Sequence, residues 1–358
     1  MKTDILIVGG GPAGSIAAKI LAKAGMDVTL IQKKFDFKKP CGGGIRFDAF
    51  DEFELDKNLI ISMVNTIDLV FKEQKIGVDI SKIPLAIVER QKFDHTLRLE
   101  AQQAGVKLFE AKLLNFTTYK EGVKAQVRFE KGVEEIEANY LIAADGVNSS
   151  IRKKLTGQTP SAILTQYADT TYNLSQNCEF HFGEDVAGNY YGWNFPEQGG
   201  SNIGTLNSKK CFETLQKNLK IDEKLKVYGY KIPHYNQPLF YKERIFFVGD
   251  SAEQVLPFTY EGIYYAMSSA KILANSLIHH YNEPHEYEKE WNKQHLKKFQ
   301  TLQKLQKIFL YNDFMIALMM KMYQSSSVQK QMMKLWLGNE AIRIDLKFFL
   351  KVVKKIFT

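Results

Sequence analysis

Cysteine is scarce in this sequence, which has only Cys41, Cys178 and Cys211 in 358 residues. An odd, widely spaced set of three argues against a disulfide framework and fits a reducing compartment. None of these cysteines has the spacing of paired metal ligands, and the seven histidines show no such spacing either. We therefore expect no bound metal.

Long apolar runs are also missing. The longest uncharged apolar stretch near the C-terminus, residues 314–320, has seven residues, whereas a membrane-spanning helix needs about 20. Residues 5–18 are largely apolar but contain three consecutive glycines, which would break the helical region of a signal peptide. We expect a cytoplasmic protein without a transmembrane segment.

The net charge of +8 is unevenly distributed along the chain. Residues 289–358 hold 14 Lys/Arg and 4 Asp/Glu, a net charge of +10, which leaves −2 for the rest of the chain. Because these lysines alternate with Met, Phe, Leu and Ile, an anionic membrane surface is a better partner than nucleic acid. The protein is then expected to be peripheral on the inner face of the membrane. In the last helix, Lys347, Lys351 and Lys354 share a face; an interfacial anchor and a helix packed on the body both remain open.

The chain is long enough for two or three structural units, and its apolar fraction of 45% is that of a globular protein. Residues 4–8 and 28–31 are predicted strands around a helical pattern, and residues 93–104 are a predicted helix before strands at 106–143. Residues 160–235 are rich in Tyr, Thr, Asn and Gly, which is typical of an antiparallel sheet. A strand at 245–248, a helix at 262–281 and further helices from 285 follow.

A glycine fingerprint, Gly9-x-Gly11-x-x-Gly14, lies between the first predicted strand and helix. There the backbone N–H groups and the helix N-terminus can hold a pyrophosphate. An acidic residue that binds the ribose is expected at the end of the second strand, where this chain has Gln32. A glutamine can accept the same hydrogen bond, but without the charge that strengthens it.

Three segments together resemble the flavin motifs of the para-hydroxybenzoate hydroxylase-like flavoproteins, in the same order and spacing: Gly9 to Gly14, Ala143 to Arg152, and Gly249-Asp250 with Glu261-Gly262-Ile263. Two more segments are similar to the geranylgeranyl reductase family within that group, Lys39 to Ile45 and Tyr191 to Pro196. The chain departs from that family at Gly188, where a proline is common, and at Ser251-Ala252-Glu253, where the family continues with Ala and Gly.

The resemblance implies an α/β fold with three parts. A discontinuous Rossmann-like FAD-binding domain would comprise residues 1–65, 88–158 and 236–282. An antiparallel-sheet domain that binds the lipid substrate would comprise residues 66–87 and 159–235, and residues 283–358 would form a basic helical region.

The expected cofactor is FAD, and the resemblance places the following residues around it: Gly9, Gly11, Pro12, Ala13, Gly14, Gln32, Lys33, Cys41, Gly42, Gly44, Arg90, Leu114, Asp145, Gly146, Gly249, Asp250, Gly262 and Ile263. Arg90 would pair with the pyrophosphate or be a solvated surface charge. Leu114 is expected on the strand after the helix that follows Arg90, with its backbone near the adenine.

Tyr191, Trp193 and Phe195 alternate along a predicted strand, so all three aromatic rings point to one face. Periodicity alone favours a core strand, whereas the resemblance favours a wall that binds the substrate. The predicted catalytic residues are Cys41, Tyr191 and Trp193, with Cys41 and Tyr191 as candidate proton donors. Cys41 is equally well explained as a small buried hydrophobic residue.

The leading functional hypothesis is an FAD-dependent reductase that saturates double bonds of a polyprenyl (geranylgeranyl-type) lipid by hydride transfer from the reduced flavin. A monooxygenase acting on an aromatic or quinone ring is the alternative on the same scaffold, and a non-catalytic prenyl-binding protein is the alternative of another class. No second dinucleotide fingerprint is visible, so either NAD(P)H or a small electron carrier could be the reductant.

Overall fold

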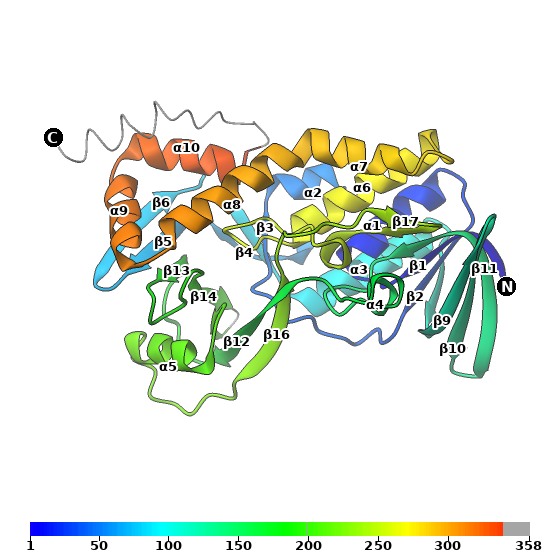
Figure 1. The fold of residues 1–358 in the computed structure, drawn as a ribbon. Coiled ribbons are helices and arrows are strands. Elements are labelled where there is room, and N and C mark those ends of the chain that lie inside the picture. Colours follow the sequence, from blue (N-terminus) through cyan, green and yellow to red (C-terminus); the bar gives the residue numbers. More distant parts are fainter. Residues whose placement is uncertain (198, 339–358) are drawn as a thin grey trace.

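The computed structural model describes residues 1–197 and 199–338, and one sheet is built around the N-terminal strand (Figure 1). Five parallel strands lie in the order β18, β11, β1, β2, β8. Their bounds are Ile245–Phe247, Gly132–Ala143, Lys2–Val8, Val28–Gln32 and Lys107–Glu110. The short strand β17 (Tyr241–Lys242) adds an antiparallel edge. Strand β1 is a continuous apolar run with Ile5, Leu6 and Ile7 fully buried, because both faces of this sheet are covered.

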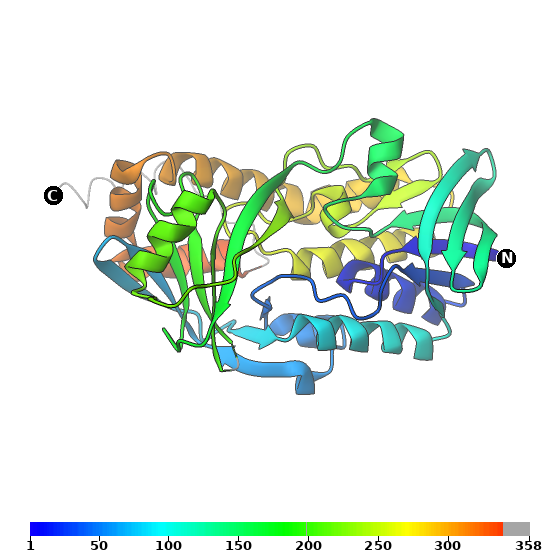
Figure 2. The ribbon, with the colours of Figure 1, turned by 90° about the horizontal axis from the view of Figure 1, so that it is seen from below.

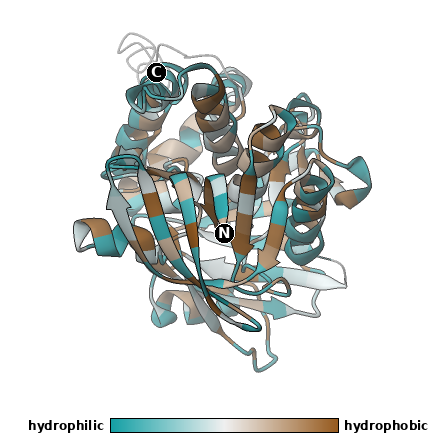
Figure 3. Cartoon of the chain, turned by 90° about the vertical axis from the view of Figure 1, so that its right-hand side faces the viewer, coloured by the Kyte–Doolittle hydropathy of each residue, from teal (hydrophilic) through white to brown (hydrophobic). Residues whose placement is uncertain are grey.

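Alternate residues of β1 belong to two hydrophobic clusters, one on each face of the sheet. Ile5 and Ile7 share a cluster with residues of α1 (Pro12–Lys23), α3 (Arg90–Gln103) and α6 (Ile263–His279). Leu6 and Val8 pack instead with β9 (Lys112–Tyr119), β10 (Gly122–Phe129) and α4 (Ser150–Thr156). Strands β9, β10 and β11 form an antiparallel layer, which lies at the end of the molecule near the N-terminus (Figure 2). Hydrophobic and hydrophilic bands alternate along the strands there, as half-buried strands require (Figure 3).

The boundary of α3 differs from the prediction. The helix begins at Arg90, three residues before the predicted start, because the Glu89 carboxylate accepts from the backbone N–H groups of Gln91 and Lys92. An acidic N-cap satisfies donors that the first turn leaves free. The predicted helix at 262–281 is α6, which spans Ile263–His279.

A second sheet has seven strands in the order β16, β12, β15, β14, β13, β5, β6. All neighbours are antiparallel except β13 and β5. In the same order, the strands span Tyr228–Pro233, Ala162–Thr170, Gly200–Thr205, Gly192–Glu197, Cys178–Phe182, Thr66–Phe71 and Gln74–Asp79. Helix α5 (Lys209–Asn218) covers one face by packing on β12 and β15. The predicted fold class is confirmed, and strands from residues 66–79 and 162–233 lie in this one sheet.

A small three-stranded sheet connects the two larger ones. Strand β7 (Leu85–Val88) pairs with β3 (Gly44–Arg46) and β4 (Ile60–Val64). Residues 85–87, which the sequence placed with the lipid-binding domain, therefore belong to this sheet. The domain boundaries themselves stay a prediction. Short helical elements at α2 (Asp48–Glu52) and at the 3-10 turns η1 (Lys57–Leu59) and η2 (Gly249–Ala252) complete the connections.

The C-terminal region is helical. Helices α7 (His285–Trp291) and α8 (Lys297–Phe309) are joined by a π-helical turn η3 (Asn292–Leu296), and α9 (Asp313–Tyr323) and α10 (Ser326–Trp336) follow. These helices extend from the first sheet to the second and lie above β5 and β6 (Figure 1). Among the described residues, none of the helices is both long and apolar enough to cross a membrane. The predicted anchor at Lys347, Lys351 and Lys354 lies outside the described residues.

Candidate functional site

The three glycine motifs meet at the ends of the parallel strands. A Cβ atom at Gly9, where φ is +108°, would lie 2.2 Å from the carbonyl oxygen of Ala144, in the second motif. A Cβ atom at Gly249, in the third motif, would lie 3.3 Å from the Cβ of Ala13. The first and second motifs therefore touch through backbone, the first and third lie in close contact at Ala13, and a side chain at Gly9 would separate the first two.

The N-terminus of α1 has room for an anion. A Cβ atom at Gly11 would meet no heavy atom within 4 Å, and the first turn of α1 has neither an acidic residue nor a side-chain cap. The N-terminus of α6, after Gly262, also lacks both. Free N–H groups and a helix dipole suit negative charge. The open N-terminus of α1 fits the pyrophosphate of a dinucleotide cofactor.

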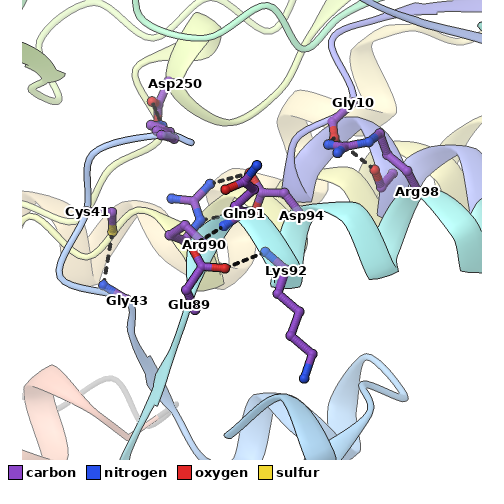
Figure 4. Close-up of polar contacts among 12 residues, drawn as sticks. Gly10, Cys41, Gly43, Glu89, Arg90, Gln91, Lys92, Asp94, Arg98 and Asp250 are labelled. Carbon is purple, nitrogen blue, oxygen red and sulfur yellow. Dashed lines mark hydrogen bonds and ion pairs between the residues drawn. The ribbon is translucent and has the colours of Figure 1, made fainter. Parts of the chain in front are cut away.

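Gln32 lies beside the glycine loop, at the end of β2. Its Oε1 accepts from the backbone N–H of Gly10 at 2.7 Å, and its Nε2 donates to the carbonyl of Lys34 at 3.0 Å. Arg98 of α3 holds the other side of the loop by donating to the carbonyl oxygens of Gly10 and Phe35 (Figure 4). The Arg98 contacts were missed by sequence reasoning, because the helix and the loop are 88 residues apart. Lys33 is exposed.

Arg90 is a buried side chain and not the solvated surface charge of the alternative. It donates two hydrogen bonds to Asp94, one turn along α3, at 3.0 and 2.8 Å (Figure 4). Burial alone would lower the pKa of Arg90, but the Asp94 carboxylate and the Cys41 thiol beside it outweigh burial and raise it. The guanidinium thus stays charged at the edge of a cavity. Its pairing with a pyrophosphate stays a prediction.

Lys39 and Asp250 form an ion pair across the same cavity. Burial lowers the pKa of Lys39, yet the adjacent Asp250 carboxylate more than compensates, so the pKa lies above its ordinary value. Asp250 was predicted to bind the flavin and Lys39 was not. Since the two residues are 211 positions apart, only the fold reveals that they pair.

The aromatic side chains of β14 line this cavity together. Tyr191, which directly precedes the strand, Trp193 and Phe195 all contribute to its wall, facing the loop at 39–44 and the start of α6. A Cβ atom at Gly42 would lie only 2.3 Å from the Phe195 ring, so the glycine permits direct contact between loop and wall. Cys41 also lines the cavity and is exposed, which excludes the buried-hydrophobe alternative.

Polar atoms of the aromatic wall already have partners. The Tyr191 hydroxyl donates to the carbonyl oxygen of Thr259 at 2.6 Å, and Trp193 Nε1 donates to Asn202 at 2.7 Å. Burial raises the pKa of Tyr191. Both residues are thereby fixed in orientation.

Asp145 and Leu114 lie away from this wall. Asp145 accepts from the backbone N–H groups of Ser150 and Ile151 at the start of α4, and burial raises its pKa. The residue after it, Gly146, has φ of +76°. Leu114 is exposed on β9 and not on β8, the strand that directly follows α3. The residue beside the C-terminal end of β2 is instead Ala111, whose N–H donates to the Gln32 carbonyl oxygen.

Glu253 explains one departure from the family pattern. Its φ is +61°, a left-handed conformation that favours glycine. Its fully buried carboxylate accepts from Arg152 at 2.8 Å and from the backbone N–H groups of Ser161, Asn236 and Gln237. These hydrogen bonds offset the backbone strain and connect the second and third motifs.

One exposed cluster could also bind a cation. Among the described residues, Glu283, His285 and Glu286 bring three ligand atoms together, although exposed acidic groups of this kind are common without a metal. This cluster is formed by neighbours in the sequence that the histidine spacing did not reveal.

Comparison with known proteins identifies the family. A model of the FAD binding domain matches residues 2–176. The chain is 30% identical to digeranylgeranylglycerophospholipid reductase 2 of Methanothermobacter thermautotrophicus, over 76% of this chain and 77% of that protein. It is 29% identical to geranylgeranyl diphosphate reductase of Synechocystis, over 92% and 91%. The chain belongs to the geranylgeranyl reductase family.

Membership makes this geranylgeranyl reductase-like protein an FAD-dependent oxidoreductase, so the predicted family, enzyme class and cofactor are confirmed. Its fold is shared with a geranylgeranyl bacteriochlorophyll reductase-like protein from Thermoplasma acidophilum, with a TM-score of 0.78, 21% identity, and coverage of 98% of this chain and 96% of that one. The reductant and the roles of individual residues stay predictions.

Proposed function

We propose that this protein saturates carbon–carbon double bonds of a polyprenyl lipid. The observation that carries the proposal is the cavity between the aromatic wall of Tyr191, Trp193 and Phe195 and the cofactor-side residues Cys41 and Ile263. An isolated alkene has no charge or hydrogen-bonding group, so apolar packing must orient it. FAD, when bound and reduced, supplies the hydride for one alkene carbon.

The proton for the other carbon would come from Cys41. Tyr191 is the weaker candidate because its hydroxyl already donates to Thr259 and burial disfavours its ionised form. Trp193 likewise uses its N–H on Asn202. Arg90 lies beside the Cys41 sulfur, and the N–H of Gly43 donates to that sulfur at 3.4 Å. These two donors would stabilise the thiolate that remains after the proton has left.

Membrane association is the second part of the proposal. Three large apolar residues around the turn between α8 and α9 are exposed: Ile308, Tyr311 and Phe314. Lys304 and Lys307, shortly before them in the sequence, are exposed as well. Apolar side chains flanked by lysines suit the surface of an anionic bilayer. Since a polyprenyl substrate is itself membrane-soluble, this position would bring the enzyme to its substrate.

Anaerobic single turnover tests the reaction. The purified protein is reconstituted with FAD, reduced with dithionite and mixed with geranylgeranyl diphosphate, and the products are identified by mass spectrometry. We expect reoxidised flavin together with a product that has gained two hydrogens per double bond. Unchanged geranylgeranyl diphosphate, together with reduced flavin that consumes oxygen faster when a phenol or quinone is added, would instead support the ring monooxygenase. A protein that cannot be reconstituted with FAD would contradict both enzymes.

The variant Gly11→Ala tests the proposed pyrophosphate site without disturbing the fold. Because nothing lies within 4 Å of the added Cβ and the φ of −79° suits alanine, the apoprotein should fold normally. The methyl group would occupy the space that the pyrophosphate needs, so we expect FAD affinity to fall by at least about tenfold.

A further inference from the structure

A second, smaller apolar chamber adjoins the substrate cavity. It lies between the strands β5 and β13 of the second sheet and the C-terminal helices α8, α9 and α10. Its lining contains no charged side chain; the apolar contacts include Leu69, Phe182, Leu302, Met332 and Met333. The described part of the C-terminal region therefore encloses one wall of a chamber.

The two spaces share four residues, Phe180, Tyr191, Thr259 and Trp336. These residues form a partition with two halves. The hydrogen bond from Tyr191 to the Thr259 carbonyl closes one half, and the edge contact between the Phe180 and Trp336 rings, with centroids 5.9 Å apart, closes the other. The four shared residues therefore separate the two chambers.

Trp336 is the less firmly held member of the partition. Its buried Nε1 has no hydrogen-bond partner among the described residues, whereas Trp193 in the first cavity is fixed by Asn202. The residue lies at the end of α10, and its indole is positioned by packing alone. Moving this ring breaks no hydrogen bond among the described residues, so packing contacts alone hold the indole between the two spaces.

We propose that the second chamber holds the hydrocarbon end of the polyprenyl chain, and that Trp336 determines how long a chain the enzyme accepts. This inference rests on the proposed function, since it assigns a place to the part of the substrate beyond the reacting bond. Burying a diphosphate or phospholipid head group is unfavourable in this chamber, because its lining has no cationic side chain to pair with the negative charge. The head group would therefore lie in the first cavity, whose lining includes Lys231 and the Lys39 that pairs with Asp250.

Chain-length dependence of binding tests the inference. Dissociation constants of the FAD-bound enzyme for geranyl, farnesyl and geranylgeranyl diphosphate are measured by calorimetry for the wild type, Trp336→Ala and Met333→Trp. Opening the partition in Trp336→Ala should improve geranylgeranyl binding relative to geranyl binding by about tenfold. Filling the chamber in Met333→Trp should weaken it by about tenfold, with geranyl binding unchanged.

Val328→Ala is the control, because Val328 is buried on α10 but lines neither chamber. It should leave the ratio of the dissociation constants unchanged. Equal effects of Trp336→Ala and Met333→Trp on all three chain lengths would overturn the chamber assignment while leaving the proposed reaction intact. Failure of the wild type to bind or reduce any of the three compounds would overturn the proposed function itself.

Discussion

Removal of the Glu253 carboxylate tests how the flavin motifs are held together. Replacement by glycine removes the strain of a left-handed φ, which should stabilise the fold by about 1 kcal/mol. It also leaves the buried Arg152 guanidinium without its counter-ion, a change that typically destabilises by about 3–5 kcal/mol. The three backbone N–H groups that donate to Glu253 lose a partner as well, at about 1 kcal/mol each.

These contributions do not add fully, because Arg152 keeps its bonds to the carbonyl oxygens of Ser251 and Gln237. We therefore expect Glu253→Gly to lower the free energy of unfolding by about 3–5 kcal/mol, and Glu253→Ala by about 1 kcal/mol more. Urea denaturation followed by circular dichroism measures both variants. In Arg152→Met/Glu253→Gly no charge is left unpaired, so the loss should be smaller than the sum of the two single variants.

The family pattern has glycine at this position, so the opposite result has a definite meaning. If Glu253→Gly is as stable as the wild type, the backbone preference outweighs the ion pair, and the carboxylate does not hold the motifs together. If the double variant lowers the free energy of unfolding by the sum of the two single effects, Arg152 and Glu253 act independently and are not coupled.

Other predictions follow from single contacts. Gly14→Ala should prevent folding, because its Cβ would lie 1.8 Å from the Gly9 carbonyl oxygen; soluble yield and circular dichroism check this. Gln32→Glu should tighten FAD binding by about threefold to tenfold, since a carboxylate accepts from ribose hydroxyls more strongly, and flavin fluorescence titration would show no change if Gln32 does not face the ribose. In Phe314→Asp, binding to anionic vesicles should fall without loss of stability, and unchanged sedimentation with vesicles would exclude this turn from the membrane contact. Burial raises the pKa of Glu179, but hydrogen bonds from His181 and other neighbours outweigh burial and lower the pKa to about 2. The ionised carboxylate therefore stabilises the fold above its unfolded pKa, and this stability is lost as pH falls from about 4.5 to about 2. Glu179→Gln should flatten this part of the acid-unfolding curve.

Local sequence patterns were sufficient to predict the glycine loop and that three alternating aromatic side chains share a face. Gly11 and Gly14 can be explained within six residues, because a Cβ atom there would meet open space or the Gly9 carbonyl oxygen, whereas Gly9 approaches the distant Ala144. Trp193 and Phe195 alternate within β14 and Tyr191 directly precedes it, and strand geometry puts alternate side chains on one face. What the alternation could not decide was whether that face meets other side chains or a cavity.

Contacts between distant segments could not be predicted. Lys39 and Asp250 are far apart in the sequence, and a lysine in a loop is ordinarily a solvated charge. The left-handed conformation of Glu253 could not be predicted either, because the hydrogen-bond donors to its carboxylate come from three other segments. The resemblance placed Leu114 on the strand after α3, but it lies on β9, because the short strand β8 comes first and is separated from β9 by one residue.

The alternatives for the last helix, a membrane anchor and a helix packed on the body, concern residues outside the described part of the chain, but the described helices α8 and α10 have an apolar and a basic face. Along α8 and α10 the apolar residues Leu302 and Trp336 face the body, while Lys304, Lys307 and Lys334 are exposed. An amphipathic helix must bury one face, and here that face encloses an apolar chamber, so the lysines are left to point outward. A single sequence pattern can therefore enclose a hydrocarbon chain on the inside and attract an anionic surface on the outside. The reductase would then accept its substrate from the same surface that holds it.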